Sequence, residues 1–186
     1  MTAVLKSLAE ENRRMWSTWI CHHLMAEFPW APHVKVVGCF SGLKAEPDLL
    51  PLLALLNRHG AQMAFFSVGQ EEMTPYLVKG DEDLVRGVFG ILEPRQNEAA
   101  RVAIADIDAV LVPGLAFSPT DGSRIGRGRG YYDRFLAHPS CRALKIGIGF
   151  SQQFIPDIPT GPYDVPVDAL VSEEGWIKLR PSTQIP

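Results

Sequence analysis

The sequence has few cysteines and lacks the apolar segments of membrane or secreted proteins. Its 186 residues include only three cysteines, Cys21, Cys39 and Cys141, and no two of them have a CxxC spacing. A disulfide framework or zinc ribbon is therefore not expected, and each thiol is interpreted as a small buried hydrophobic group. No apolar run approaches the roughly 20 residues of a membrane-spanning helix, and residues 1–30 lack a signal-peptide core. We expect a cytoplasmic protein without a membrane partner.

The chain also lacks a strong overall charge. Eighteen Lys and Arg residues against 21 Asp and Glu residues give a net charge of −3, which argues against a general nucleic-acid binder. The hydrophobic fraction of 46% is ordinary for a globular protein, and the length predicts a single domain over residues 1–186. Four basic residues lie between Arg124 and Arg134. This local excess of positive charge is the first indication of function.

Helical and strand patterns alternate along the chain. Apolar residues at spacings of three and four predict one helix over residues 4–28, ended by Pro29. Strands are predicted at 34–40, 61–68, 109–117 and 144–150, helices at 48–60 and 131–138, and an edge strand or hairpin at 169–179. The third strand is interrupted at Pro113-Gly114, and residues 69–105 are interpreted as surface loops with short strands.

This order of elements predicts the fold class. A strand, a helix and a second strand within about 35 residues form a βαβ unit, which implies parallel pairing with a right-handed crossover. We therefore predict a three-layer α/β/α sandwich with a mostly parallel, Rossmann-like sheet. Such sheets bind ligands at the carboxyl ends of their strands, so the loops after Phe40, Phe117 and Phe150 are the expected location of a site.

The segment 114–137 is the most informative part of the chain. At its centre, residues 126–130 alternate glycine and arginine as GRGRG. Glycine allows positive φ angles and lets backbone N–H groups converge on a ligand, while the guanidinium groups supply forked donors for phosphate oxygens. Tyr131 follows at once and begins a predicted helix, whose N-terminus has free N–H donors. Together these features predict a loop that binds polyphosphate.

Two other interpretations of this loop are open from the residues alone. It could be a flexible surface loop, or an arginine-glycine element that binds RNA without sequence preference. The chain has no GxxxxGK[ST] motif and no GxGxxG after a first strand, so no standard nucleotide motif decides the matter. The preceding buried strand and the direct continuation into Tyr131-Tyr132-Asp133 favour phosphate binding, and the net charge of −3 weighs against RNA.

Several carboxylates are placed where they could serve this loop. Asp133, in the first turn of the predicted helix, either complements the helix dipole or holds Mg²⁺, which takes one or two carboxylates plus phosphate oxygens. Asp164 and Asp168 lie in a proline-rich loop and are either solvated or a second metal carboxylate. Glu46 follows the strand at 34–40, and is either an ordinary acid at a helix start or a ligand contact.

These segments resemble the 5-formyltetrahydrofolate cyclo-ligase family, also called methenyltetrahydrofolate synthetases. The resemblance rests on VPGLAF and DGSRIGRGRGYYDRFL, residues 112–117 and 121–136. Residues 40–60, 87–94 and 146–175 are similar to other family segments and occur in the same order, so the resemblance covers about residues 10–175. It implies an α/β/α sandwich, in agreement with the fold predicted from the residues.

The resemblance also implies a reaction. Family members convert 5-formyltetrahydrofolate to 5,10-methenyltetrahydrofolate with ATP and Mg²⁺, releasing ADP and phosphate. The formyl oxygen attacks the γ-phosphorus, N10 captures the resulting iminium phosphate, and phosphate leaves as the ring closes. Positioning and charge neutralisation do most of the work in such phosphoryl transfer. The expected partner is a small molecule and not a nucleic acid, and we expect a monomer.

Site residues follow from the same resemblance. The implied ATP-binding residues are Arg124, Ile125, Gly126, Arg127, Gly128, Arg129, Gly130, Tyr131 and Tyr132. The implied substrate-binding residues are Ser41, Glu46, Arg127, Gly128, Arg129, Gly130 and Tyr131. Among these, Arg127, Arg129 and Tyr131 would be catalytic, the two arginines by neutralising phosphate charge, and Glu46 would hydrogen-bond the pterin. Asp133 and Asp164 would be the Mg²⁺ ligands.

Two parts of the chain depart from the family pattern. Members usually begin with a further helix whose Lys-x-x-x-Arg element reaches ATP, and Lys6, Arg13 and Arg14 do not match its order and spacing. The predicted strand 61–68 ends in FFSV, where the family commonly has a proline. We therefore expect this chain to start near the family's second helix. A non-catalytic relative that binds folate or nucleotide is the alternative to an active cyclo-ligase.

Overall fold

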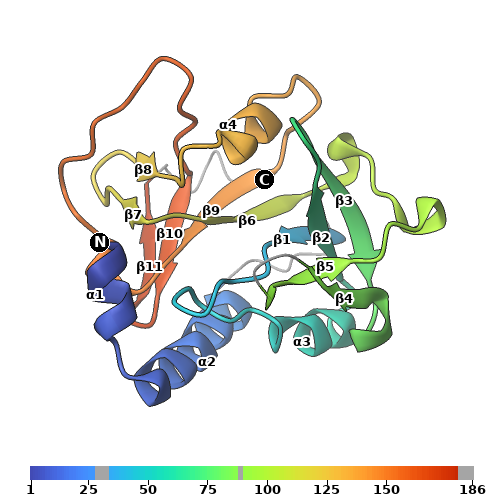
Figure 1. The fold of residues 1–186 in the computed structure, drawn as a ribbon, viewed down its shortest axis with the longest axis horizontal. Coiled ribbons are helices and arrows are strands. Elements are labelled where there is room, and N and C mark those ends of the chain that lie inside the picture. Colours follow the sequence, from blue (N-terminus) through green and yellow to red (C-terminus); the bar gives the residue numbers. More distant parts are fainter. Residues whose placement is uncertain (28–33, 88–89, 180–186) are drawn as a thin grey trace.

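A mixed sheet forms the centre of the computed structural model, which describes residues 1–27, 34–87 and 90–179 (Figure 1). Seven strands of the described chain pair in the order β11-β10-β9-β6-β1-β2-β3. Their bounds are Val36–Cys39 (β1), Gln62–Val68 (β2), Met73–Val78 (β3), Ala109–Pro113 (β6), Leu144–Ile148 (β9), Ala169–Ser172 (β10) and Gly175–Lys178 (β11). The five central strands β10, β9, β6, β1 and β2 pair with their neighbours in parallel. The edge strands β11 and β3 pair antiparallel with β10 and β2.

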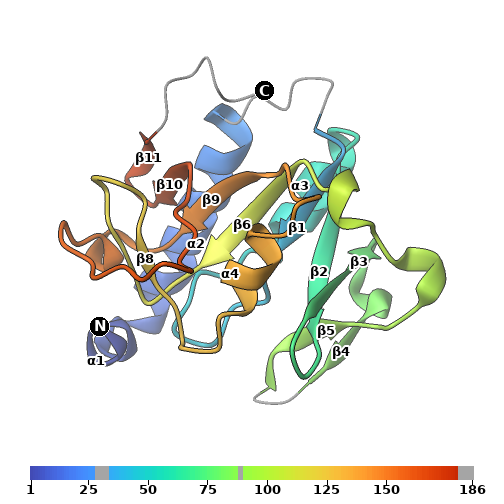
Figure 2. The ribbon, with the colours of Figure 1, turned by 90° about the horizontal axis from the view of Figure 1, so that it is seen from above.

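Helices cover both faces of this sheet. Helices α2 (Glu10–Glu27) and α3 (Leu52–Arg58) lie on one face, and α4 (Tyr131–Leu136) lies on the other (Figures 1 and 2). Two core clusters correspond to the two faces: Ile20, Leu24, Leu52 and Leu56 belong to the first, and Phe117, Phe135 and Leu136 to the second. The predicted α/β fold with a mostly parallel sheet and helices on both faces is therefore confirmed.

The topology has a switch point beside β1. The chain runs from β1 outward to β2 on one side, and β6, which comes later, pairs with β1 on the other. Because these strands are parallel, the loops that follow β1 and β6 leave the same edge of the sheet. Ligand sites of open α/β sheets form in the crevice at such a point.

The prediction of one helix over residues 4–28 is wrong in one respect. The structure has two helices, α1 (Thr2–Ser7) and α2, because Leu8 adopts an extended conformation with ψ of 133°. The Arg13 guanidinium donates a hydrogen bond to the Leu8 carbonyl oxygen, which an uninterrupted helix would use itself. The apolar spacing is kept across the break, so periodicity alone does not reveal it. Pro29 lies outside the described residues.

The helix predicted over 48–60 is also shorter than expected, since α3 begins at Leu52. Pro47 and Pro51 have no backbone N–H to donate, and Pro51 takes the position just before the first helical turn. The predicted terminator Gly60 has a φ of +76°, which a residue with a side chain rarely adopts. As a consequence, Glu46 lies in the loop before α3 and not at the start of a helix.

Residues 69–105 contain more sheet than predicted. Strand β3 pairs with β2 over six positions, from Met63–Val78 to Val68–Met73. Pro75 removes one donor from β3, which is tolerated because β3 is an edge strand. Two short strands, β4 (Leu84–Arg86) and β5 (Leu92–Pro94), form a separate antiparallel hairpin. Short 3₁₀ turns at 81–83, 98–100 and 104–106 complete this segment.

Three other expectations agree with the structure. The predicted strand 109–117 is interrupted at Pro113-Gly114, where β6 ends. After this point β7 (Ala116–Phe117) pairs with β8 (Arg124–Ile125) outside the main sheet. The C-terminal hairpin β10–β11 lies at the sheet edge. Cys21 and Cys39 are buried free thiols, and burial raises the pKa of both, that of Cys21 to about 12. For Cys141 the prediction of burial is wrong, because its free thiol lies in a half-buried residue after α4. In the described part of the chain, no helix is both long and apolar enough to span a bilayer.

Candidate active site at the carboxyl ends of the strands

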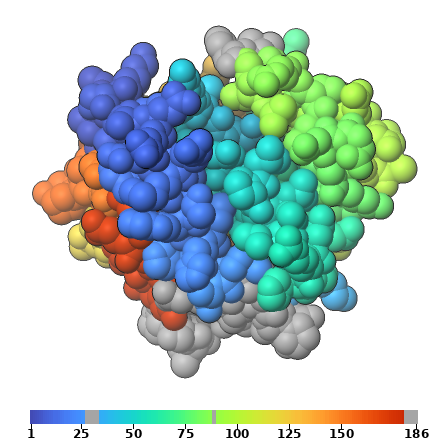
Figure 3. All heavy atoms as spheres, turned by 90° about the horizontal axis from the view of Figure 1, so that it is seen from below, coloured from blue at the N-terminus to red at the C-terminus, as the bar shows by residue number. Residues whose placement is uncertain are grey.

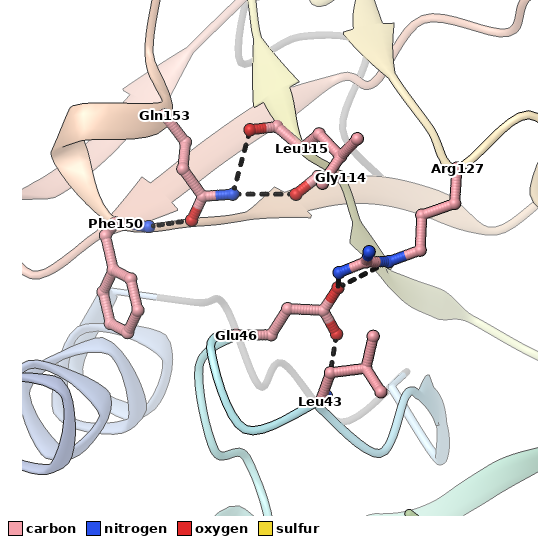
Figure 4. Close-up of polar contacts among 7 residues, drawn as sticks. All are labelled: Leu43, Glu46, Gly114, Leu115, Arg127, Phe150 and Gln153. Carbon is pink, nitrogen blue, oxygen red and sulfur yellow. Dashed lines mark hydrogen bonds and ion pairs between the residues drawn. The ribbon is translucent and has the colours of Figure 1, made fainter. Parts of the chain in front are cut away.

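Glu46 and Arg127 meet across the crevice at the switch point (Figure 4). The Oε1 atom of Glu46 accepts hydrogen bonds from Arg127 Nη2 at 2.6 Å and Nε at 3.1 Å. Glu46 comes from the β1–α3 loop and Arg127 from the β8–α4 loop, which includes GRGRG. The Glu46 side chain is 7% exposed and the Arg127 side chain 45% exposed, so the pair has one buried and one open side.

A tight turn aims the Glu46 carboxylate at this crevice. The backbone N–H of Glu46 donates to the Leu43 carbonyl at 2.8 Å, and the Leu43 N–H donates to Glu46 Oε2 at 2.9 Å. The side chain thus closes its own turn with one oxygen and binds Arg127 with the other. Sequence spacing identified Glu46 as a candidate, but its partner on a loop 81 positions away required the structure.

The GRGRG loop exposes its second arginine to solvent. Gly128 and Gly130 have φ angles of +82° and +64°, which explains why both positions are glycine. Between them, Arg129 is exposed, and no partner for its guanidinium occurs among the described residues. Among the described residues, the loop therefore presents one paired cation, Arg127, and one unpaired cation, Arg129.

Gln153 joins the roots of two loops at this edge of the sheet (Figure 4). Its side chain is fully buried; the Oε1 atom accepts from the Phe150 N–H at 2.8 Å, and the Nε2 atom donates to the Gly114 carbonyl at 2.7 Å. A longer bond of 3.4 Å reaches the Leu115 carbonyl. The ends of β6 and β9 are thereby held together. Sequence reasoning missed this residue, although its position just after a predicted strand was a usable signal.

The start of α4 is tied to the turn between β2 and β3. The Tyr131 hydroxyl donates to the Gly69 carbonyl at 3.1 Å and to the Gln70 carbonyl at 3.2 Å. The Arg134 guanidinium donates to the Glu71 carbonyl at 2.8 Å and lies 5.1 Å from the Tyr131 ring centroid. These contacts fix the place where the GRGRG loop enters the helix, and Tyr131 is half-buried against the second core cluster.

Tyr132 points toward the protein interior. Its ring packs edge-on against Phe66, with 5.9 Å between centroids, and the Arg124 guanidinium lies 5.8 Å from its centroid. Burial, more than the nearby charges, raises the pKa of its phenol far above the usual value. Tyr132 is therefore a neutral packing residue under the polar part of the crevice.

Asp133 contacts the loop that carries Asp164 through a backbone hydrogen bond. Asp133 Oδ1 accepts from Arg124 Nη2 at 2.7 Å and from the Val165 N–H at 3.2 Å. Asp164, the neighbour of Val165, accepts from the Gly161 N–H with Oδ2 at 2.7 Å. The structure thus brings the first turn of α4, which carries Asp133, next to the loop that carries Asp164. Asp168, the third carboxylate considered, is buried and accepts from the Lys145 backbone N–H at 2.9 Å.

Carboxylate oxygens of the kind that Asp133 and Asp164 provide are ligands that Mg²⁺ prefers. Each uses one oxygen for protein donors, and no described residue donates to Asp133 Oδ2 or Asp164 Oδ1. Within the described chain, no group of three or more His, Cys, Asp or Glu side chains could hold a metal by itself. A metal here would need ligand oxygens from elsewhere, which is how Mg²⁺ is commonly held beside a phosphate.

A cavity of about 420 Å³ adjoins Glu46. It lies between α2, the β1–α3 loop and the β4–β5 hairpin, which meet on the face shown in Figure 3. Phe40, Phe65 and Ile91 give it apolar walls, and the Ser41 hydroxyl accepts from the Leu92 N–H at 3.0 Å. The cations that line it are Arg13, Arg14, Lys44 and Arg86. The arrangement suits a flat, partly apolar ligand with an anionic end.

The geometry agrees with comparisons to known proteins. A family model described as the 5-formyltetrahydrofolate cyclo-ligase family matches residues 1–173. The chain belongs to this family. It is 40% identical over 181 residues to the mitochondrial 5-formyltetrahydrofolate cyclo-ligase of Arabidopsis thaliana, an alignment that covers 83% of this chain and 65% of the relative. The chain therefore spans just under two thirds of that relative's length.

Solved structures of cyclo-ligase family relatives have the same fold. The 5,10-methenyltetrahydrofolate synthetase of Aquifex aeolicus is 34% identical, with a TM-score of 0.82 over 97% of this chain and 91% of that one. A synthetase from Mycoplasma pneumoniae is 22% identical, with a TM-score of 0.74 over 92% of this chain and 93% of that one, and supports the fold alone. Family membership predicted from the GRGRG segment is thus confirmed.

Proposed function

We propose that the protein is an ATP- and Mg²⁺-dependent 5-formyltetrahydrofolate cyclo-ligase. The observation that carries this proposal is the hydrogen-bonded contact of Glu46 with Arg127. Glu46 is the residue expected to hold the pterin, and Arg127 is expected to neutralise phosphate. Their direct contact supports adjacent folate and triphosphate sites, as an attack of the formyl oxygen on the γ-phosphorus requires.

The cavity next to Glu46 is the proposed folate site. A carboxylate that is buried on one side can accept hydrogen bonds from the N–H groups of a pterin, and the apolar walls from Phe40, Phe65 and Ile91 suit its ring faces. The glutamate end of the folate is anionic, and Arg14 and Lys44 are exposed cations of the lining without partners in the described chain. They are positioned to attract that end.

The GRGRG loop is the proposed triphosphate site. Arg129 is free to bind phosphate oxygens, and Arg127 can join it when its bond to Glu46 opens. The chain's own part in catalysis is to place the γ-phosphorus beside the formyl oxygen and to offset the developing charge. Mg²⁺, held by Asp133 and Asp164, would contribute further neutralisation of the phosphate oxygens.

The proposed reaction has two steps, and each forms one bond to a reacting centre and breaks another. The formyl oxygen forms a bond to the γ-phosphorus, and ADP leaves with the electron pair of the broken P–O bond. N10 then attacks the activated formyl carbon and loses its proton, and inorganic phosphate leaves with the former formyl oxygen. Water must be kept from the activated carbon, and the largely buried Glu46 side of the crevice is suited to this.

The test is the appearance of the methenyl product by its near-ultraviolet absorbance. With 5-formyltetrahydrofolate, ATP and Mg²⁺, we expect an increase that is absent without ATP and abolished by EDTA. Asp164→Asn should lower the rate, whereas Asp157→Asn, an exposed aspartate of the same loop, should leave it unchanged. Folate binding by calorimetry without any product would instead support the alternative, a non-catalytic relative.

A further inference from the structure

Arg124 differs from the other arginines of its segment in being buried. Its side chain is 4% exposed, whereas Arg127 and Arg129 are exposed. It belongs to β8, which pairs with β7, so its backbone is fixed by the ladder before the loop begins. Its guanidinium lies over the Tyr132 ring, and an added Cβ on Gly126 would be 3.1 Å from its Nη1 atom. The β7–β8 ladder, the Tyr132 ring and the GRGRG loop thus enclose most of this side chain.

The contacts of Arg124 are directed at one oxygen of Asp133. Its Nη2 atom donates to Oδ1 at 2.7 Å, and the Val165 N–H donates to the same oxygen at 3.2 Å. No described group donates to Oδ2. Two donors on a single oxygen fix the rotation of the carboxylate, and they leave the other oxygen without a donor from the described chain.

The burial of Arg124 has an unfavourable component. Its Nε–H is buried and has no hydrogen-bond partner in the described chain. A buried unpaired donor is destabilising, so stability alone would favour an apolar side chain of similar size here. The arginine is therefore better explained by what it does to Asp133 than by a contribution to folding.

We propose that Arg124 is a positioning residue that orients Asp133 for the metal. This inference rests on the proposed function, in which Asp133 is a Mg²⁺ ligand. Carboxylates that bind metals are generally held by a further donor, and loss of that donor typically weakens metal binding about 10–100-fold. Arg124 and Val165 supply that support here.

The experiment compares Arg124→Met and Arg124→Lys with the parent, and uses Arg142→Met as a control at an exposed arginine. Mn²⁺ binding is measured by electron paramagnetic resonance in the presence of a non-hydrolysable ATP analogue. For Arg124→Met we expect affinity for Mn²⁺ to fall about 10–100-fold. Lysine can donate to the same oxygen and should recover part of the loss, and the control should match the parent.

Two further measurements separate this role from others. Thermal unfolding in EDTA should show no loss of stability in Arg124→Met beyond a few degrees, because the remaining Asp133 side chain is 20% exposed and keeps the Val165 N–H as a donor. Binding of the ATP analogue in EDTA should fall much less than Mn²⁺ binding, because a positioning role acts through the metal. An equally large loss of analogue binding without metal would overturn the proposal in favour of a phosphate contact.

The remaining outcomes are equally decisive. Unchanged Mn²⁺ affinity with a large loss of thermal stability would make Arg124 purely structural, and tighter Mn²⁺ binding would mean that it only competes for the carboxylate. If the parent binds no Mn²⁺ with the analogue, the metal assignment and this inference fall together. If Mn²⁺ binding depends on Arg124 but no methenyl product forms, the inference stands and the proposed activity fails.

Discussion

The Glu46 carboxylate and the Arg127 guanidinium are hydrogen-bonded to each other across the crevice, although they are 81 positions apart in the chain. Each belongs to a different proposed ligand site, the folate cavity and the triphosphate loop. While this hydrogen bond is present, Arg127 blocks one acceptor oxygen of Glu46, and Glu46 engages two donor atoms of Arg127. A ligand that takes Arg127 away from Glu46 frees the carboxylate for the second ligand.

This relationship predicts that the two substrates bind cooperatively. We expect the affinity for 5-formyltetrahydrofolate to rise about fivefold when a non-hydrolysable ATP analogue is present, at the low end of typical coupling, because Arg127 is partly exposed. Calorimetry with and without the analogue measures this factor. In Arg127→Met the factor should disappear, and in Arg142→Met it should persist. Equal folate affinities in the parent under both conditions would contradict the prediction.

The two carboxylates predict a shared dependence on Mg²⁺. Asp133→Asn and Asp164→Asn each remove one negative charge but keep the hydrogen bonds that Val165 and Gly161 donate. We expect each to raise the Mg²⁺ concentration for half-maximal rate at least about tenfold, in the range seen when metal sites are perturbed. The check is a rate titration with Mg²⁺ at saturating ATP. Asp157→Asn should follow the parent curve, and an identical curve for Asp133→Asn would remove that residue from the metal site.

Features of the fold that depend on local sequence patterns were predicted correctly, and features that depend on contacts between particular side chains were not. Alternating patterns and the strand-helix-strand order predicted the sheet, its parallel core and the ligand edge, because these depend on local periodicity. The break at Leu8 and the late start of α3 were missed because one depends on a side-chain contact from Arg13 and the other on two prolines acting together. The contact between Glu46 and Arg127 joins segments whose separation no local pattern encodes.

The site shows the same division. The GRGRG segment and its flanks were sufficient to predict a phosphate loop and, by resemblance, the family. They did not distinguish Arg124 from Arg127 and Arg129, because burial follows from the pairing of β7 with β8. Nor did they identify Gln153. The two hydrogen bonds of its side-chain amide can form only when the ends of β6 and β9 lie side by side.

The cavity cations predict an electrostatic contribution to folate binding. Arg14→Gln and Lys44→Gln should each raise the KM for 5-formyltetrahydrofolate about two- to fivefold, the range of an exposed ion pair, with kcat nearly unchanged. Because such pairs are screened by salt, the effect should shrink as ionic strength rises. Steady-state kinetics at low and high salt test this. Lys6→Gln, an exposed lysine on α1, is the matched control, and a kcat effect without a KM effect would disprove this role.

The buried bridge made by Gln153 predicts that replacing this residue lowers protein stability far more than replacing its neighbour Gln152. Gln153→Leu leaves the Phe150 N–H and the Gly114 carbonyl buried without partners, which should reduce the free energy of unfolding by about 2–3 kcal/mol. Gln152 is exposed, so Gln152→Leu should change it by less than about 0.5 kcal/mol. Denaturant titrations of the two variants measure the contrast. Equal stability of the two would mean that the ends of β6 and β9 do not depend on this bridge.

The buried thiols predict both their reactivity and a pH dependence of stability. At about pH 8, a thiol reagent should modify Cys141 alone among the three cysteines of the native protein, and all three after unfolding.

Burial, reinforced by the Asp48 charge, raises the pKa of Cys21 from 9.0 to about 12. Above about pH 9 the unfolded chain therefore loses this proton while the native chain retains it, so the free energy of unfolding should fall as pH rises. Urea titrations at increasing pH should show a smaller decline for Cys21→Ala than for Cys141→Ala. A decline of equal size in both would place its cause in groups other than Cys21, and rapid labelling of Cys21 in the native state would mean that the contact between α2 and the β1–α3 loop opens readily.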